Sequence, residues 1–245
     1  MSNRKTTVTI MAAGEGKRMN SSLPKVLHLF RGVPMLIRIL REVTIAGADK
    51  IIVVTGKYDQ IIQETVQTYM PNNHIIFVQQ TVPKGTADAI RYTLDYYTAD
   101  EDVLILNGDM PLITAKLLRD FLQYTCGNNK IMVASLENPT GYGRILFDTN
   151  QTCIGIKEEK DCTEEERAIS IVNVGIYFFP ATILQTFIPK IENHNRQNEY
   201  YLTDIIRLCT DANEPIYTYC IDETQRYQIM GVNTPDELEY LELLL

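Results

Sequence analysis

The sequence predicts an α/β fold: a doubly wound, mostly parallel sheet with helices on both faces. The main observation is an alternation in which short runs rich in Val and Ile recur between longer segments whose apolar residues repeat every three or four positions. Most of these runs are continuously apolar, as expected for strands covered on both sides. A chain of 245 residues with 45% hydrophobic and 22% charged residues can form a full core without disulfides or a structural metal.

Five runs predict the strands of this sheet, at residues 6–11, 50–55, 75–79, 102–107 and 131–136. Helices are predicted between them at residues 34–46, 58–69, 85–97 and 114–124, with Thr114 as an N-cap. Beyond residue 138 the alternation gives way to Gly-rich turns and strand-like pieces at 143–148, 153–157 and 171–179. Thr234 followed by Pro235 predicts a last helix over 235–245. We expect one domain, divided into 1–137, a smaller α+β cover at 138–234, and the helix.

The overall charge and the cysteines exclude several kinds of protein. A net charge of −8 argues against a dedicated nucleic-acid or anionic-membrane binder. The five cysteines are odd in number and form no CxxC pair, so neither a disulfide framework nor a zinc site is indicated. The apolar segment 8–13 is too short for a signal peptide or a membrane span. We therefore expect a soluble cytoplasmic protein, taken as a monomer by default, and interpret the acidic stretch 158–167 as solvated.

The loop after the first predicted strand is typical of a phosphate-binding site. Small residues and glycines let backbone N–H groups approach an anion, and cations in the same loop add positive charge; the residues concerned are Ala12, Ala13, Gly14, Gly16, Lys17, Arg18 and Lys25. A dinucleotide-binding fingerprint fails because Met19 occupies the place of its third small residue. A Walker A loop fails because Lys17 is followed by Arg18 rather than Ser or Thr.

Asp109 follows the predicted strand 102–107 and is the candidate metal ligand. Ligands of open α/β sheets bind at the carboxyl ends of the strands, and Mg²⁺ commonly takes only one or two protein carboxylates beside phosphates and water. A turn aspartate that bonds its own backbone is the alternative. No Ser or Cys nucleophile motif is evident. A phosphate monoester, already carrying close to two negative charges, can attack an α-phosphate without a side-chain base.

Further polar residues remain open between binding and structural roles. Gln80 can read a base edge because its amide both donates and accepts, whereas Gly85 and Thr86 equally well begin a helix. Asn233 precedes the last helix and is a cap or a second metal ligand. Neutral and acidic side chains of the kind that bind sugar hydroxyls occur at Glu158, Asn173 and within 199–204.

Taken together, these motifs resemble the sugar-1-phosphate nucleotidyltransferases, most closely the uridylyltransferase domain of bacterial N-acetylglucosamine-1-phosphate uridylyltransferase. They appear in family order over nearly the whole chain: Ala-Ala-Gly-x-Gly-x-Arg-Met with Pro-Lys, Gln-x4-Gly-Thr, Gly-Asp-x-Pro-Leu, Pro-Thr-Gly-Tyr-Gly-Arg-Ile, Asn-x-Gly, Glu-Tyr-Tyr-x-Thr-Asp and Gly-Val-Asn. The resemblance implies a Rossmann-like fold of the nucleotide-diphospho-sugar transferase type. Residues 1–137 would be its nucleotide-binding half and 138–234 its sugar-binding half.

The resemblance also implies substrates and roles. UTP and N-acetylglucosamine-1-phosphate would give UDP-N-acetylglucosamine and pyrophosphate, with Mg²⁺ as cofactor. Arg18 and Lys25 would meet the phosphates, and Asp109 and Asn233 would ligate Mg²⁺. The implied uracil site consists of Ala12, Ala13, Gly14, Gln80, Gly85 and Thr86, and the implied sugar site of Gly143, Glu158, Asn173, Tyr201 and Thr203.

Some positions depart from the family pattern. Lys17 replaces the usual Thr and either alters phosphate affinity or points to solvent, and residues 55–58 replace a commoner Gly-His-Gly loop. No hexapeptide-repeat region follows, so we expect neither acetyltransferase activity nor the trimer that such a region forms. Other readings are the same chemistry on another sugar or nucleotide, such as glucose-1-phosphate with UTP or dTTP, and a non-catalytic nucleotide-sugar binder. A nicotinamide-dependent oxidoreductase fails at Met19 and Lys57.

Overall fold

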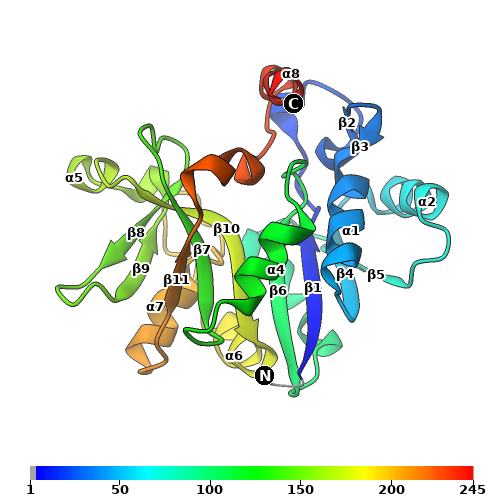
Figure 1. Cartoon of the computed structure of the whole chain (residues 1–245). Coiled ribbons are helices and arrows are strands. Elements are labelled where there is room, and N and C mark those ends of the chain that lie inside the picture. Colours follow the sequence, from blue (N-terminus) through cyan, green and yellow to red (C-terminus); the bar gives the residue numbers. More distant parts are fainter. Residues whose placement is uncertain (1–3, 245) are drawn as a thin grey trace.

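The computed structural model describes residues 4–244 and is built around a central sheet (Figure 1). Within that range the main strands follow the order β11-β7-β10-β6-β1-β4-β5, and the β8–β9 hairpin extends from β10. The strands are β1 (Lys5–Met11), β4 (Lys50–Thr55), β5 (Ile75–Gln79), β6 (Glu101–Asn107), β7 (Lys130–Ser135), β8 (Gly143–Phe147), β9 (Cys153–Lys157), β10 (Ile171–Pro180) and β11 (Tyr217–Cys220). Pairing is parallel from β6 through β5, so these strands end at one edge.

Helices cover both faces of the sheet, as the continuous apolar strands predict. One face packs against α1 (Met35–Ala46), α2 (Asp59–Tyr69) and α4 (Ala115–Gln123), and the other against α3 (Thr86–Arg91), α6 (Ala181–Phe187) and α7 (Asp204–Asp211). Successive residues of β6 point to opposite faces of the sheet. Leu104 and Leu106 pack in the core beneath α1, α2 and α4, and Val103 and Ile105 pack in the core beneath α3, α6 and α7. From residue 4 to residue 244, no helix combines the length and apolarity needed to cross a membrane.

Most predicted elements agree with the structure to within a residue, and the Thr114 hydroxyl caps α4 by accepting from the amide of Leu117 at 3.2 Å. The predicted helix 85–97 is wrong in its second half, because α3 ends at Arg91 and a 3-10 turn, η3 (Leu94–Tyr96), follows. Thr93 lies at this break. Its hydroxyl donates to the Ile90 carbonyl at 2.7 Å and pairs with the Tyr97 hydroxyl at 2.7 Å. This side chain tightens the backbone into the shorter turn.

The second half of the chain continues the same sheet. β10 lies between β6 and β7 and runs antiparallel to both, and β11 extends the sheet beyond β7. The strands predicted after residue 138 are therefore present, but β11, α6 and α7 were not foreseen. The strand β11 is only four residues long and two of its residues are exposed, so it leaves no clear pattern in the sequence. The division of binding roles at residue 137 stays a prediction.

The C-terminal helix α8 (Pro235–Leu243) lies at the edge where β1 and β6 end (Figure 1). Thr234 and Glu237 form a capping box at its start, as the Thr-Pro pair led us to expect of a capped helix. Leu241 and Val232 join a small buried cluster with Met19 and Phe30 from the beginning of the chain. The helix ends before the predicted limit at residue 245, which lies outside the described residues together with residues 1–3. This packing brings residues 231–237 beside the first loop.

Candidate active site

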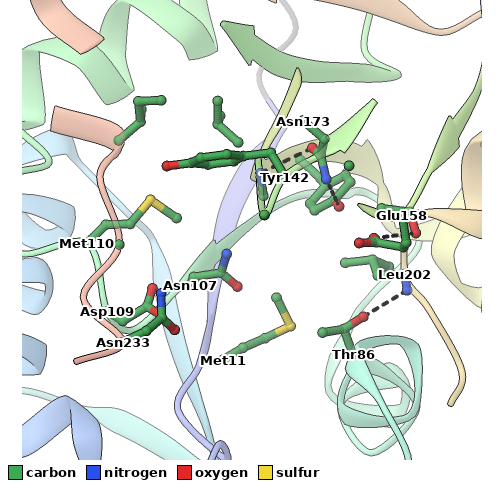
Figure 2. Close-up of a pocket in the computed structure, with 18 of the residues that line it drawn as sticks. Met11, Thr86, Asn107, Asp109, Met110, Tyr142, Glu158, Asn173, Leu202 and Asn233 are labelled. Carbon is green, nitrogen blue, oxygen red and sulfur yellow. Dashed lines mark hydrogen bonds between the residues drawn. The ribbon is translucent and has the colours of Figure 1, made fainter. Parts of the chain in front are cut away.

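Two adjoining cavities open at the carboxyl ends of β1 and β6. The large cavity, about 390 Å³, extends toward β8, β9 and β10, and the small cavity, about 310 Å³, toward the 12–15 loop and the start of α3. Four residues line both: Met11, Thr86, Asn107 and Asp109. In Figure 2, Asp109 and Asn233 lie together at one end of the large cavity and Glu158 at the other, with Asn107 and Met11 between.

The structure brings together the predicted site residues with one exception. The small cavity is lined by Ala12, Ala13, Gly14, Lys25, Gln80, Gly85, Thr86 and Asp109. The large cavity is lined by Arg18, Thr86, Asp109, Gly143, Glu158, Asn173, Thr203 and Asn233. Tyr201 lines neither cavity. It lines a separate pocket, which Glu158 also lines, and its hydroxyl accepts a hydrogen bond from the Gln197 side chain at 2.5 Å. Their individual binding roles stay predictions.

A compact charged centre lies where the two cavities meet. Lys25 Nζ lies 2.5 Å from Asp109 Oδ2 and 3.1 Å from Asn233 Oδ1, and Arg18 Nη2 donates to the same Asn233 oxygen at 3.0 Å. The Lys25 and Asp109 side chains are only 15% and 17% exposed, so solvent screens this pair less than a surface pair. Two cations thus lie at the junction of the two cavities, Arg18 lining the large one and Lys25 the small one.

The same two oxygens fit a divalent metal. Asp109 and Asn233 both direct an oxygen at one ammonium group, so a single cation can contact both. Residues 4–244 contain no group of three or more His, Cys, Asp and Glu side chains suited to hold a metal. A hard cation such as Mg²⁺ does not require such a group, because phosphate oxygens and water complete its shell. One carboxylate and one amide oxygen are therefore an adequate protein contribution.

The glycine-rich loop is held by close backbone contacts. Gly16 adopts φ +62°, and a Cβ there would lie 2.6 Å from the Lys25 Cβ, so only glycine fits this approach. Met19 anchors the far end of the loop in the cluster beneath α8. The Lys17 side chain is 86% exposed and lines neither cavity, and it pairs at 3.0 Å with Glu15, which lines the small cavity. Of the two alternatives left open for Lys17, this exposed position favours the one in which the side chain points to solvent.

The start of α3 is attached to the segment that begins at Tyr200. The Tyr200 amide donates to the Lys84 carbonyl, and the Ala87 amide to the Tyr200 carbonyl, both at 2.8 Å. Gly85 has φ +116°, and a Cβ there would lie 2.4 Å from the Tyr200 carbonyl oxygen. The Thr86 hydroxyl accepts from the Leu202 amide at 2.9 Å, a bond visible in Figure 2. Thr86 thus has a structural role in the wall between the cavities as well as a place in the site.

Polar side chains cluster at the far end of the large cavity. Thr203 donates its hydroxyl hydrogen to Glu158 Oε1 at 2.9 Å. Burial raises the pKa of Glu158, the Thr203 hydrogen bond opposes that shift, and nearby Asp204 adds to it. The Asn173 amide donates to the Tyr177 hydroxyl at 2.7 Å and its oxygen accepts from the Gly175 amide at 3.1 Å, which fixes its orientation. The remainder of the acidic stretch is largely exposed, as interpreted from the sequence.

Sequence reasoning missed several lining residues, among them two polar side chains that bear on the site. Asn107 lines both cavities, and its position as the polar last residue of a buried strand is a signal that could have identified it. Glu237 lines the large cavity, and its carboxylate accepts from the backbone N–H of Asn233 at 2.5 Å. The capping box therefore also orients the segment that carries Asn233. Tyr142, from the Pro-Thr-Gly-Tyr-Gly-Arg-Ile motif, also lines the large cavity (Figure 2).

Paired cavities at the carboxyl ends of parallel strands, with a glycine-rich loop and clustered cations, define a class of α/β proteins built to hold a phosphorylated ligand. The chain belongs to the nucleotidyl transferase family, whose model matches residues 7–225. A solved structure of UDP-glucose pyrophosphorylase with UDP-glucose has the same fold, with a TM-score of 0.77, 15% identity and 98% coverage of both chains.

Curated relatives match over nearly the whole chain. A probable UDP-N-acetylglucosamine pyrophosphorylase of Acanthamoeba polyphaga mimivirus is 40% identical over 98% of this chain and 96% of its own length. Bifunctional protein GlmU of Dechloromonas aromatica is 36% identical over 96% of this chain, and that of Psychrobacter sp. is 35% identical over 99%. The chain spans about half the length of these two bacterial relatives, 51% and 52%.

Proposed function

We propose that this protein is a Mg²⁺-dependent uridylyltransferase that makes UDP-N-acetylglucosamine and pyrophosphate from UTP and N-acetylglucosamine-1-phosphate. The observation that carries the proposal is the centre of Lys25, Arg18, Asp109 and Asn233 at the junction of two cavities. Membership of the nucleotidyl transferase family and the mimiviral relative support it.

The arrangement of the cavities suits an in-line transfer. UTP would occupy the small cavity with its base near Gln80 and Gly85 and its phosphates at the charged centre. The sugar phosphate would enter through the large cavity, where one of its oxygens attacks the α-phosphorus of UTP. The bond from that phosphorus to the bridging β-phosphate oxygen breaks, and pyrophosphate leaves with the electron pair. No side chain needs to remove a proton, because the attacking phosphate is already ionised.

The residues at the centre act by position and charge. Lys25 and Arg18 would stabilise the negative charge that builds on the phosphate oxygens, in a place partly shielded from water. Asp109 and Asn233 would hold Mg²⁺, which when bound supplies charge neutralisation and orients the phosphates. Glu158, Asn173, Thr203 and the Gly143 backbone would bind the sugar and align its phosphate with the reacting phosphorus.

Pyrophosphate release tests this function. A matrix of sugar-1-phosphates against UTP, dTTP, CTP, ATP and GTP, each with Mg²⁺ and with EDTA, gives substrate and metal dependence together. We expect release with UTP and N-acetylglucosamine-1-phosphate, and none in EDTA. Release with another pair, such as glucose-1-phosphate with UTP or dTTP, would keep the chemistry and overturn the assigned substrates. If the protein binds UTP but releases no pyrophosphate with any pair, a non-catalytic nucleotide-sugar binder would be favoured.

We further infer a monomer acting in the cytoplasm on small-molecule substrates. The residues that we assign to the reaction all lie in one chain. Sedimentation velocity tests the first inference: a species near 28.0 kDa supports it, and a concentration-independent oligomer contradicts it. Fractionation of cells that contain the protein tests the second.

A further inference from the structure

The amide of Gln80 is held in one orientation. Its Nε2 donates to Asp88 Oδ2 at 2.7 Å and to the Gly85 carbonyl at 3.3 Å. An ionised carboxylate and a carbonyl only accept hydrogen bonds. The terminal group of Gln80 that faces these two oxygens must therefore be its NH₂, and Oε1 must point the other way. Neighbours that can only accept remove the usual ambiguity between the two ends of an amide.

The oxygen of this amide is left for a ligand. Gln80 lines the small cavity, and its backbone amide is fixed by the Thr55 carbonyl at 2.8 Å. No side chain or backbone group of residues 4–244 donates to Gln80 Oε1. Gln80 thus presents a hydrogen-bond acceptor toward the cavity where we place the base of UTP.

Asp88 is a buried carboxylate without a cationic partner in the described part of the chain. It lies in the first turn of α3 and is only 8% exposed, yet in the described part of the chain no lysine, arginine or histidine pairs with it. The Gln80 amide is the side-chain donor that satisfies its carboxylate. A buried carboxylate without an ion pair is costly, so a purely structural explanation for it is weak. The first turn of a helix reduces that cost but requires no contact with Gln80.

We propose that Asp88 is a positioning residue that determines pyrimidine selectivity by orienting Gln80. This inference rests on the proposed function, in which the small cavity holds the uracil ring. N3 of uracil carries a hydrogen and donates, whereas N3 of cytosine is unprotonated and accepts. With NH₂ held by Asp88, Gln80 Oε1 pairs with the uracil N3–H and opposes the cytosine N3. Asp88 itself touches no substrate.

Substitution of Asp88 tests the proposal through a ratio rather than through activity alone. We expect Asp88→Ala to lower the preference for UTP over CTP, as the ratio of their kcat/KM values, by about tenfold, because the freed amide can turn its NH₂ toward cytosine. Asp88→Asn allows both orientations of the Gln80 amide and should lower the ratio less than Asp88→Ala does. Asp88→Glu keeps a carboxylate acceptor and should keep most of the wild-type ratio. The KM for the sugar phosphate should stay unchanged in all three.

Asp95→Asn is the matched control, since it removes an exposed carboxylate just beyond α3 and should leave the ratio unchanged. Equal losses with UTP and CTP in the Asp88 variants, with the ratio preserved, would overturn the proposal and show a structural role. If Asp88→Ala fails to fold, Asp88→Asn and Asp88→Glu carry the comparison.

Failure of the proposed function has a different signature. It would appear as an inactive wild-type protein with every sugar phosphate. Calorimetric Kd values for UTP and CTP would then still test Asp88: an unchanged ratio of Kd values between wild type and Asp88→Ala rejects the inference, and a reduced ratio supports it.

Discussion

The two ends of the site are built differently. The end that we assign to the nucleotide consists mainly of backbone and small residues in short loops that follow parallel strands, such as Ala12 to Gly14. The end that we assign to the sugar consists of side chains from an antiparallel hairpin, a bulged strand and a helix start: Glu158, Asn173 and Thr203. Backbone recognition leaves a motif in the sequence, whereas a side-chain cluster drawn from several elements leaves scattered polar residues.

The two ends are joined by the attachment of α3 to the segment at Tyr200. Three hydrogen bonds cross this junction, and they bring Gly85 and Thr86 next to Tyr200 and Leu202. Arg91 adds a contact, since its guanidinium carbon lies 4.2 Å from the centre of the Tyr200 ring. A change at this junction should therefore affect both substrates, whereas a change deep in either cavity should affect one.

The largest expected effect lies at the charged centre, which both ends share. We expect Asp109→Ala to lower kcat by about 10²–10³-fold, about 3–4 kcal/mol, because it removes a metal ligand and leaves Lys25 without its acid partner. Steady-state pyrophosphate release at saturating Mg²⁺ measures this. Asp120→Ala, which breaks an exposed helix pair with Lys116, is the control and should retain full activity. More than a tenth of the wild-type rate in Asp109→Ala would contradict the metal assignment.

A second substitution tests the junction. Gly85→Ala places a methyl group against the Tyr200 carbonyl in a backbone conformation that L-residues rarely adopt. We expect a loss of about 1–3 kcal/mol in the free energy of unfolding, and higher KM values for both substrates. Denaturant unfolding and steady-state kinetics measure the two effects. Gly32→Ala has a similarly positive φ with open space around it and separates backbone strain from the steric contact. A KM change for only one substrate would show that the two ends are independent.

The third prediction isolates the sugar end. Glu158→Gln keeps the shape of the side chain and removes its charge, so we expect the KM for the sugar phosphate to rise about tenfold while the KM for UTP is unchanged. Initial rates with each substrate varied in turn measure the split. An equal rise in both KM values would contradict a sugar-specific role.

The pH dependence of sugar binding follows from the same carboxylate. Because burial raises the pKa of Glu158, its charged form is lost at a higher pH than for an exposed glutamate as the pH falls, and the KM for the sugar phosphate should rise there. The Thr203 hydroxyl opposes this shift, so Thr203→Val should raise the pKa of Glu158 further and move the rise to higher pH. Glu158→Gln should abolish that dependence. A profile unaffected by either substitution would assign the titration to another group.

The smallest effect is expected at Lys17. Its side chain is exposed and lines neither cavity, and its only ion pair within residues 4–244 is with Glu15, so Lys17→Ala should change kcat and the KM for UTP by less than about twofold. Arg18→Ala is the matched comparison one residue along, and it should weaken turnover strongly because Arg18 lines the large cavity beside Asn233. A large effect at Lys17 would show that the loop rearranges when the nucleotide binds.

The positions of most strands along the chain, and a site at the carboxyl ends of parallel strands, could be anticipated because local patterns encode them. A buried parallel strand needs a continuous apolar run, and a close approach of backbone to an anion needs glycine, so β1, β4, β6 and the 12–16 loop are visible in the sequence. The neighbours Lys17 and Arg18 show what such local patterns cannot predict. Both are cations in the same loop, but only tertiary packing determines that one faces solvent and the other the cavity.

By itself the sequence determined the fold class, the glycine-rich loop, the family and many of the polar residues that line the cavities, since each depends on residue type and local spacing. Tertiary structure decided which of these residues meet. Asn233 is 208 positions from Lys25, and it reaches the site because α8 packs on Met19 and Phe30. The contact of Asp88 with Gln80, and hence the direction of an amide, likewise depends on the path of the chain between β5 and α3. Such contacts are set by packing at distances of a few ångströms, which spacing along the chain does not specify.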